Sequence, residues 1–132
     1  MKAPPSSARR LEAWRRGRRS EALAAWLLRL KGYRILARDL RLPGGEIDIL
    51  AARGRTLAVI EVKRRAGAAA AAEALQPRQR GRILRAARLY IAGRPELARH
   101  RVRFDVILFD GGLLPRHLAG AWQDDAGAAG SF

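Results

Sequence analysis

The segment of residues 46–63 constrains the fold more than any other part of this chain, because it has the pattern of two strands around a tight turn. Residues 46–52 and 56–63 both have the composition of strands, and Gly54-Arg55 lies between them. Glycine at the first position of a two-residue type II′ turn is a common way to join antiparallel strands. The pattern therefore predicts a β-hairpin with Gly54 and Arg55 as its loop.

Two facing carboxylates beside a lysine follow from this hairpin if its loop has two residues. The register then places Asp48 opposite Glu61. It also places Glu46 opposite Lys63, whereas a loop of odd length would break both pairs. Because side chains alternate between the two faces of a strand, Glu46, Asp48 and Leu50 are expected on one face with their opposed residues. Directly opposed side chains have Cβ atoms about 4.5–5.5 Å apart, so the carboxylates are expected to lie close together.

Such a pair of carboxylates is normally repulsive, so a basic neighbour, a shared proton or a divalent cation should offset the repulsion. Oxygen ligands suit Mg²⁺ or Mn²⁺, and an adjacent lysine can orient water or stabilise phosphate charge. With such a metal, the arrangement predicts hydrolysis of a phosphodiester. The alternative is that Glu61 and Lys63 form the solvated face of a half-buried strand, and that residues 44–48 are a turn feeding a strand.

The net charge of the chain favours a polyanionic partner. Lys and Arg number 27 and Asp and Glu number 12 among 132 residues, which gives a net charge of +15. This excess fits nucleic acid or an acidic membrane surface and does not by itself separate them. A membrane surface is the weaker alternative, because neither expected helix pairs a long apolar face with aromatic anchors. Residues 1–20 and 78–103 hold most of the excess, at +6 and +8, around a more balanced centre.

Length and composition predict one packed domain in the cytoplasm. The hydrophobic share of 48% is ample for a core, and the length suits a single domain. Cysteine is absent, which excludes disulfides and thiolate metal sites. No apolar run approaches the roughly 20 residues that span a bilayer, and the first residues lack the apolar stretch of a secretory signal. We expect a flexible basic arm at residues 1–12, a domain at 13–122 and a flexible tail at 123–132.

The other segments predict helices packed on a mixed sheet. A first helix should begin near Leu11 or Arg18 and end at Leu30, with a buried apolar stripe formed by Leu23, Trp26, Leu27 and Leu30. A second helix should begin at Pro77 and end at Gly93. The remaining segments are strands at 33–41 and 102–109, an ambiguous segment at 113–122 and an alanine-rich segment of uncertain structure at 67–74. The predicted order is α-β-β-β-α-β.

The second expected helix has a basic face. Arg78, Arg82 and Arg85 share this face at helical spacing, which is typical of a track for backbone phosphates, although a solvated helix face has the same pattern. The sequence lacks helix-turn-helix and RNA-recognition signatures, which favours recognition of the backbone or of shape over base readout. His100 and His117 are isolated in the sequence and have no partner at the spacing of a zinc site or a catalytic triad.

The acidic hairpin resembles the PD-(D/E)xK nucleases in two short motifs, Gly-Glu-Ile-Asp at 45–48 and Ile-Glu-Val-Lys at 60–63. More closely, residues 14–122 resemble the YraN-like family of small bacterial proteins, which is similar in fold to archaeal Holliday-junction resolvases. The further motifs that carry this resemblance are Gly17 with Glu21, Gly32-Tyr33, Arg65, Ala86-Ala87 with Tyr90, Arg103-Phe104-Asp105-Val106, His117-Leu118 and Ala121-Trp122. The resemblance implies a restriction-endonuclease-like fold of the tRNA-endonuclease-like kind.

The resemblance also implies roles for residues of the hairpin. Asp48 and Glu61 would be ligands of Mg²⁺ or Mn²⁺, and the backbone carbonyl of Val62 would be a further ligand. Lys63 would be the catalytic lysine. Glu21 matches the extra helical carboxylate of resolvase-like members, which binds the metal directly or through water.

Three positions outside the hairpin have alternative interpretations. Glu21 could instead be a surface acid of the helix that pairs with Arg18 or Arg29. Arg65 would contact phosphate in the resemblance, and is otherwise one more solvated charge. The family usually has a Gly/Phe-containing stretch and then a lysine that opens the second helix, whereas this chain is alanine-rich there and has Gln79 or a neighbouring arginine at the lysine position.

Together these features predict a nucleic-acid-binding protein that acts as a metal-dependent endonuclease on DNA, with branched DNA as one expected substrate. Resolvase-like relatives also imply a homodimer. The arginines expected to contact nucleic acid are Arg18, Arg19, Arg65, Arg78, Arg82 and Arg85. Two alternatives stay open: a catalytically inactive nucleic-acid-binding module on a nuclease scaffold, and a basic protein that associates with RNA or the ribosome.

Overall fold

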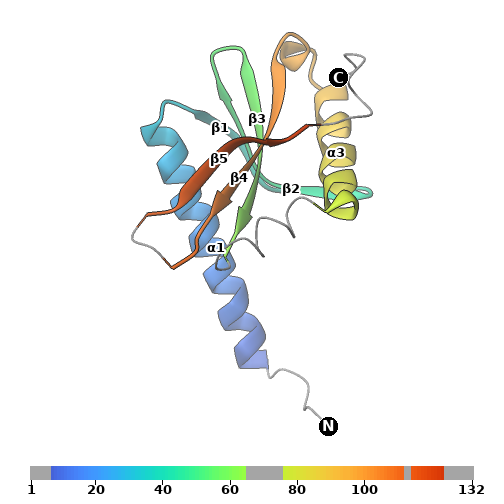
Figure 1. The fold of residues 1–132 in the computed structure, drawn as a ribbon. Coiled ribbons are helices and arrows are strands. Elements are labelled where there is room, and N and C mark those ends of the chain that lie inside the picture. Colours follow the sequence, from blue (N-terminus) through green and yellow to red (C-terminus); the bar gives the residue numbers. More distant parts are fainter. Residues whose placement is uncertain (1–6, 65–75, 112–113, 124–132) are drawn as a thin grey trace.

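The fold is a five-stranded sheet with a long helix on each face (Figure 1). The computed structural model describes residues 7–64, 76–111 and 114–123. In chain order the elements are α1 (Ser7–Leu30), β1 (Arg34–Leu42), β2 (Gly45–Arg53), β3 (Thr56–Lys63), α3 (Pro77–Ala92), the short 3-10 helix η1 (Pro95–Leu97), β4 (Arg101–Leu108) and β5 (Arg116–Trp122). This order confirms the predicted mixed α/β fold and adds β5, in the segment that the sequence left ambiguous.

The strands lie side by side in the order β1-β2-β3-β4-β5, so β1 and β5 are the edges. Neighbouring strands are antiparallel except β3 and β4, which are parallel. A parallel pair requires a crossover connection, and α3 lies within that connection. Between β2 and β3 the pairs run from Arg53 with Thr56 to Ile49 with Ile60, which confirms the predicted register over this part of the hairpin. The two further predicted pairs, Asp48 with Glu61 and Glu46 with Lys63, are not formed among the described strand pairs.

Alternating side chains of the sheet pack into two cores, one under each helix. The core on the α3 face includes Leu50, Leu57, Val59, Ile83 and Tyr90. The core on the α1 face includes Ile49, Ala51, Ala58 and Ile60 of the sheet with Ala24, Ala25 and Leu28 of α1. Because both faces of the central strands are covered, β2 and β3 are buried along most of their length. The two helices therefore bring different residues to opposite faces of the hairpin.

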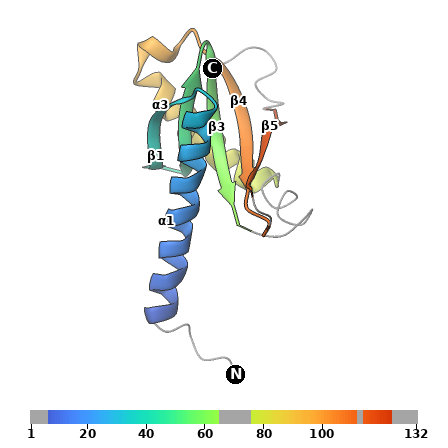
Figure 2. The same ribbon diagram turned by 90° about the vertical axis from the view of Figure 1, so that its left-hand side faces the viewer.

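Helix α1 begins earlier than the sequence predicts. It starts at Ser7 rather than at Leu11 or Arg18, so residues 7–12 of the expected arm are helical. The first half of α1 extends beyond the sheet (Figure 2). In residues 7–19, all side chains that the structure describes are exposed. This half of the helix therefore contributes no packing to the described cores.

The buried face of α1 also differs from the prediction. Leu23, Trp26 and Leu30 of the predicted stripe are 57%, 60% and 81% exposed. The side chains buried against the sheet are instead those of Ala24, Ala25 and Leu28. Small alanine side chains let the helix approach the sheet closely, so the face with the least bulk is the one that packs.

The ends of the remaining elements agree with the predictions made from the sequence, wherever the sequence makes one. Helix α3 has Pro77 in its first turn and Gly93 as its C-cap. Strand β5 ends at Trp122, whose ring stacks on Phe104 with the ring centroids 4.0 Å apart. Neither long helix, as far as the structure describes them, is apolar enough over a sufficient length to cross a membrane. The alanine-rich segment at 67–74 and most of the expected tail lie outside the described residues.

Candidate functional site

The candidate site forms where β2 and β3 stop pairing. The backbone pairs end at Ile49 with Ile60. Beyond this pair, the backbone N–H of Val62 donates to Asp48 Oδ2 at 2.8 Å. On the other side of β2, Asp39 of β1 has a φ of +47°, a left-handed conformation that few non-glycine residues adopt. The Asp48 carboxylate thus takes the place of a backbone partner where both neighbours of β2 are irregular.

The alternation of side chains along β2 breaks at Asp48. Ile49 packs in the core under α1, so strict alternation would place Ile47 there as well. Ile47 packs instead in the core under α3, and Asp48 lines a pocket beside α1. The prediction that Glu46, Asp48 and Leu50 share one face is therefore wrong for Asp48. The reason is the irregular strand geometry on both sides of this residue, which a strict two-residue period does not include.

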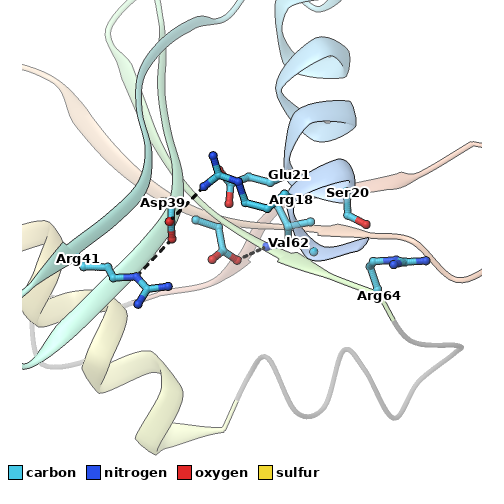
Figure 3. Close-up of a pocket in the computed structure, with 9 residues that line it drawn as sticks. Arg18, Ser20, Glu21, Asp39, Arg41, Val62 and Arg64 are labelled. Carbon is cyan, nitrogen blue, oxygen red and sulfur yellow. Dashed lines mark hydrogen bonds and ion pairs between the residues drawn. The ribbon is translucent and has the colours of Figure 1, made fainter. Parts of the chain in front are cut away.

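A pocket of about 230 Å³ opens beside Asp48, between α1 and the ends of the first three strands (Figure 3). Its lining residues are Gly17, Arg18, Ser20, Glu21, Asp39, Arg41, Asp48, Val62 and Arg64. The pocket thus brings together Asp48, Glu21 and Val62, three of the four residues predicted as metal ligands. The fourth, Glu61, does not line it.

Glu21 is a buried acid of α1 that reaches this pocket. Its Oε1 lies 3.4 Å from Arg38 Nε on β1. The ion pair of Glu21 is therefore with Arg38 rather than with Arg18 or Arg29, the two partners considered from the sequence. Burial raises the pKa of Glu21, although Arg38 and Arg18 favour its charged form.

The other two acids of the pocket differ in the cations that face them. Asp39 pairs with both Arg18 and Arg41, each at 3.5 Å (Figure 3). Asp48 takes part in none of the ion pairs among the described residues, and its hydrogen bond comes from a neutral backbone N–H. Asp48 is therefore the least compensated charge of the pocket.

These surroundings shift the pKa of Asp48 strongly. Burial raises the pKa of Asp48 from 3.8 to about 7, against the opposing hydrogen bond from Val62. Three nearby negative charges raise the pKa further, those of Glu61, Glu21 and Glu46. A proton or a cation is thus favoured at this carboxylate near neutral pH.

Glu61 faces α3 rather than the pocket. Its Oε1 lies 3.1 Å from Lys63 Nζ and accepts a 2.8 Å hydrogen bond from Gln79 Nε2 of α3. Its Oε2 is buried and has no hydrogen-bond partner among the described residues. Burial raises the pKa of Glu61, although Lys63 and Gln79 favour the charged form. Glu61 is only 5% exposed, so the interpretation of Glu61 and Lys63 as a solvated strand face does not hold for Glu61.

The donor chemistry of the site suits a hard divalent cation. Asp48 lacks a cationic partner within the described chain, and Glu61 has one buried oxygen that accepts no hydrogen bond there. Among the described residues, no three His, Cys, Asp or Glu side chains form a cluster that could hold an ion. Mg²⁺ is usually bound by one or two carboxylates and keeps water and phosphate oxygens as its other ligands. Asp48 and Glu61 supply two such carboxylates at the same end of the hairpin, Asp48 in the pocket beside α1 and Glu61 on the side of α3.

The arginines of α3 line a second hollow, of about 540 Å³. The residues around it are Arg41, Leu42, Gly44, Gly45, Glu46, Arg78, Arg82 and Arg85. Arg82 lies 3.5 Å from Glu46, and Arg85 Nε donates to the Gly44 carbonyl at 2.9 Å. The predicted basic face is thus present on the α3 side of the hairpin, with two of its arginines held at the β1–β2 turn and with Arg78 exposed.

The remaining arginines predicted to bind nucleic acid lie in different places. Arg18 lines the pocket beside Asp48, and Arg19 is exposed on α1. Arg65 lies outside the described residues. Sequence reasoning missed Arg38, which pairs with Glu21, and Arg41, which lines the pocket. The basic residues of β1 can be seen in the sequence. Their position beside the pocket follows from the place of β1 at the edge of the sheet, which the sequence does not show.

A second buried carboxylate, Asp105 on β4, has a full set of hydrogen bonds. It is 1% exposed and accepts hydrogen bonds from Arg103 Nε and Nη2 at 2.9 and 2.8 Å. His117 Nε2 lies 2.8 Å from its Oδ2, and the Gly120 N–H donates to its Oδ1 at 2.9 Å. Burial acts to raise the pKa of Asp105, but these hydrogen bonds together lower it. His117, isolated in the sequence, thus has a carboxylate partner because β5 pairs with β4.

The described elements define a mixed α/β protein whose central hairpin ends in an acidic pocket. Residues 20–109 match the uncharacterised protein family UPF0102. The chain is 54% identical over 113 residues to a UPF0102 protein of Parvibaculum lavamentivorans, a match that covers 86% of this chain and 85% of the relative. It is 50% identical over 127 residues to a UPF0102 protein of Paramagnetospirillum magneticum, covering 93% and 98%. The chain therefore belongs to the UPF0102 family, which is the YraN-like family that its motifs indicate.

Proposed function

We propose that this protein is a metal-dependent endonuclease that hydrolyses phosphodiester bonds of DNA. The observation that carries the proposal is the environment of Asp48. This carboxylate is held by one backbone N–H, lies near three other acids and has a pKa raised to about 7. Such an arrangement is unfavourable for an acid that only supports the fold, and it is typical of an acid that holds a cation or a proton during a reaction.

In this proposal Asp48 and Glu61 hold Mg²⁺ or Mn²⁺, with the backbone carbonyl of Val62 and the carboxylate of Glu21 nearby. The buried Glu61 Oε2 and the uncompensated charge of Asp48 support these two residues as ligands. When bound, the ion supplies Lewis acidity for the phosphate and lowers the pKa of an attacking water. The acids of this chain contribute the negative charge that attracts the ion to this end of the hairpin.

Lys63 and Gln79 supply the polar groups on the other side of Glu61. The Lys63 side chain is 21% exposed, and its Nζ lies 3.1 Å from Glu61 Oε1. At this place an ammonium orients a water molecule or neutralises charge that develops on the phosphate. Gln79 donates to Glu61 Oε1 and so fixes the direction of the carboxylate.

Arginines around the site would supply the affinity for DNA. The net charge of +15 and the exposed arginines of α1 and α3 support a polyanionic partner. The residues in question are Arg18, Arg19, Arg78, Arg82 and Arg85. Contacts of this kind bind backbone phosphates, so the affinity should depend strongly on salt and weakly on sequence.

An assay of DNA cleavage tests the proposal. Wild type, Asp48→Asn and Lys63→Gln are incubated with Mg²⁺ or Mn²⁺ on plasmid, flapped and four-way-junction DNA. We expect cleavage by the wild type, loss of cleavage in both variants and unchanged binding of DNA. The control is Arg34→Ala, at an exposed position at the start of β1, which should cleave as the wild type does. A wild type that is inactive on every substrate would refute the proposal.

An inactive nucleic-acid-binding module on the same scaffold is the second candidate. Two observations favour it: the lack of a three-acid cluster among the described residues, and the ion pair that holds Lys63 against Glu61. This candidate predicts salt-dependent binding of DNA without any response to Mg²⁺. A titration of Mg²⁺ followed by thermal unfolding separates the two, because only a metal-binding site should raise the melting temperature of the wild type above that of Asp48→Asn.

A further inference from the structure

Arg41 lies where the two hollows meet. It lines the pocket beside Asp48, and it also lines the hollow formed by the arginines of α3. Its side chain is 72% exposed and pairs with Asp39 at 3.5 Å (Figure 3). Because α1 and α3 pack on opposite faces of the sheet, this one arginine connects a site on one face with a site on the other.

The connection lies at an edge of the sheet, since β1 pairs only with β2. The turn between these strands contains two glycines that allow close packing. Gly44 has a φ of +79°, and a Cβ on Gly45 would lie 1.9 Å from the carbonyl oxygen of Arg82. The turn therefore packs directly against α3, which brings the arginines of that helix to the end of β1 beside Arg41.

We propose that an unpaired DNA strand runs from the Asp48 pocket across Arg41 to the arginines of α3, and so passes around this edge of the sheet. The inference rests on the proposed nuclease function and adds the kind of substrate, which is DNA with a single-stranded segment at the site. The side chains along the second part of this path are Arg41, Arg78, Arg82 and Arg85. Glu46, the acid beside that part, is already paired with Arg82 at 3.5 Å.

A paired duplex does not fit this path because it is too stiff. Duplex DNA has a persistence length of about 50 nm, whereas this path turns around a single edge strand, β1. The path passes from one face to the other at the edge strand, which is a far sharper turn than a duplex makes at low cost. A single strand turns at each backbone bond, and a positively charged groove can follow its phosphates.

Binding measured in EDTA tests the path, because it does not depend on cleavage. Fluorescence anisotropy compares a single-stranded oligonucleotide, a blunt duplex of the same length and a fully paired four-way junction. We expect the wild type to bind the single strand most tightly. Arg41→Ala should remove this preference and reduce the slope of log affinity against log salt by about 0.7, the value for one phosphate contact on a single strand.

Two further variants make the result specific to the path. Arg41→Lys keeps the charge and should retain most of the preference for the single strand. Arg34→Ala removes an exposed arginine from the other end of the same strand and should change neither the preference nor the salt slope. Circular dichroism of each variant checks that the fold is kept. Tighter or equal binding of the blunt duplex, or equal losses in Arg41→Ala and Arg34→Ala, would overturn the path.

The failure of this inference can be told apart from the failure of the nuclease proposal. Cleavage that requires Asp48 but proceeds as fast on a blunt duplex as on DNA with an unpaired segment would refute the path alone. Binding of the single strand that depends on Arg41, without cleavage of any substrate, would support the path and refute the nuclease proposal.

Discussion

Asp48 and Asp105 lie in the same sheet but have opposite surroundings. Asp105 is matched by donors, two of them from Arg103 and one from His117. Asp48 accepts a hydrogen bond from the backbone of Val62 and has no ion pair within the described residues. The donors of Asp105 lower its pKa in spite of burial, whereas burial raises the pKa of Asp48 to about 7.

This difference separates a buried acid whose charge is matched by donors from one whose charge is not. The hydrogen bonds of Asp105 continue outward, because Arg103 Nη2 donates to the Tyr33 hydroxyl at 2.5 Å and Lys31 Nζ donates to His117 Nδ1 at 2.6 Å. The network thus joins the end of α1 to β4 and β5. A buried charge with matched partners is kept in place by the fold, whereas an unmatched one needs another explanation.

The largest expected effect is that of Asp105→Asn on stability. We expect the free energy of unfolding to fall by about 3 kcal/mol, because the change breaks a buried ion pair from one side and leaves Arg103 without its carboxylate. Urea unfolding at neutral pH measures this. Glu96→Gln, at an exposed position, is the control and should change stability by no more than about 0.5 kcal/mol. A loss as small as the control's would remove the distinction between the two aspartates.

Asp48→Asn should reduce activity and leave stability unchanged or higher, the reverse of what we expect for Asp105→Asn. We expect the rate of DNA cleavage to fall by about 100-fold or more, a typical size for loss of one electrostatic group at a reacting phosphate or carbonyl. Its free energy of unfolding at pH 8 should be equal to that of the wild type or higher, because the variant removes a poorly compensated buried charge. Cleavage rates and urea unfolding of the same preparations check both points. A stability loss as large as that of Asp105→Asn would show that Asp48 supports the fold.

The effect of Mg²⁺ on stability also tests whether Asp48 differs from an acid that supports the fold. A concentration of Mg²⁺ at about 100 times its dissociation constant should stabilise the wild type by about 2.7 kcal/mol. The same concentration should leave Asp48→Asn unchanged, since this variant lacks the proposed ligand charge. Thermal unfolding at pH 8 with and without EDTA measures the effect. Equal stabilisation of wild type and Asp48→Asn would place the ion elsewhere on the chain.

The raised pKa of Asp48 also predicts how stability depends on pH. The folded protein keeps the Asp48 proton up to about pH 7, whereas the unfolded chain releases it near the ordinary value of 3.8. The stabilisation is therefore present below that value and is lost as the pH rises towards 7. The lowered pKa of Asp105 acts in the opposite direction, because its contribution is lost as the pH falls. Urea unfolding across this range should show a steeper decline in the wild type than in Asp48→Asn, because the raised pKa values of Glu21 and Glu61 act in both proteins. Parallel curves would argue against the raised pKa of Asp48.

Local signals account for the parts of the fold that the sequence predicts well. The turn at Gly54 and Arg55 determines the register of the hairpin, because a two-residue loop leaves one way to pair the strands. Helix α3 is equally local, with Pro77 in its first turn and Gly93 at its end. The order of elements follows from such signals, and so does the placement of Glu61 beside Lys63.

The sequence-based predictions are wrong where contacts between different elements determine which side chains are buried. The face of Asp48 depends on the irregular backbone at Asp39 in the neighbouring strand, which no two-residue period contains. The stripe at Leu23 is exposed because alanines pack more closely on the sheet. His117 has no partner at a recognisable spacing in the sequence because its partner, Asp105, belongs to another strand. Each of these depends on contacts between elements, so patterns within one element do not reveal them.

The parallel pairing of β3 and β4 has a consequence for the order of folding. The hairpin that carries Asp48 and Lys63 closes through a two-residue loop, and such hairpins form within about 1–10 μs. The pairing of β3 with β4 must instead close the long segment that contains α3, and non-local contacts of this kind form later. We therefore expect the strand that bears Asp105 to join the sheet after the β2–β3 hairpin has formed. A chain that ends before β4 is expected to contain the acidic residues of the site but not the sheet that positions them.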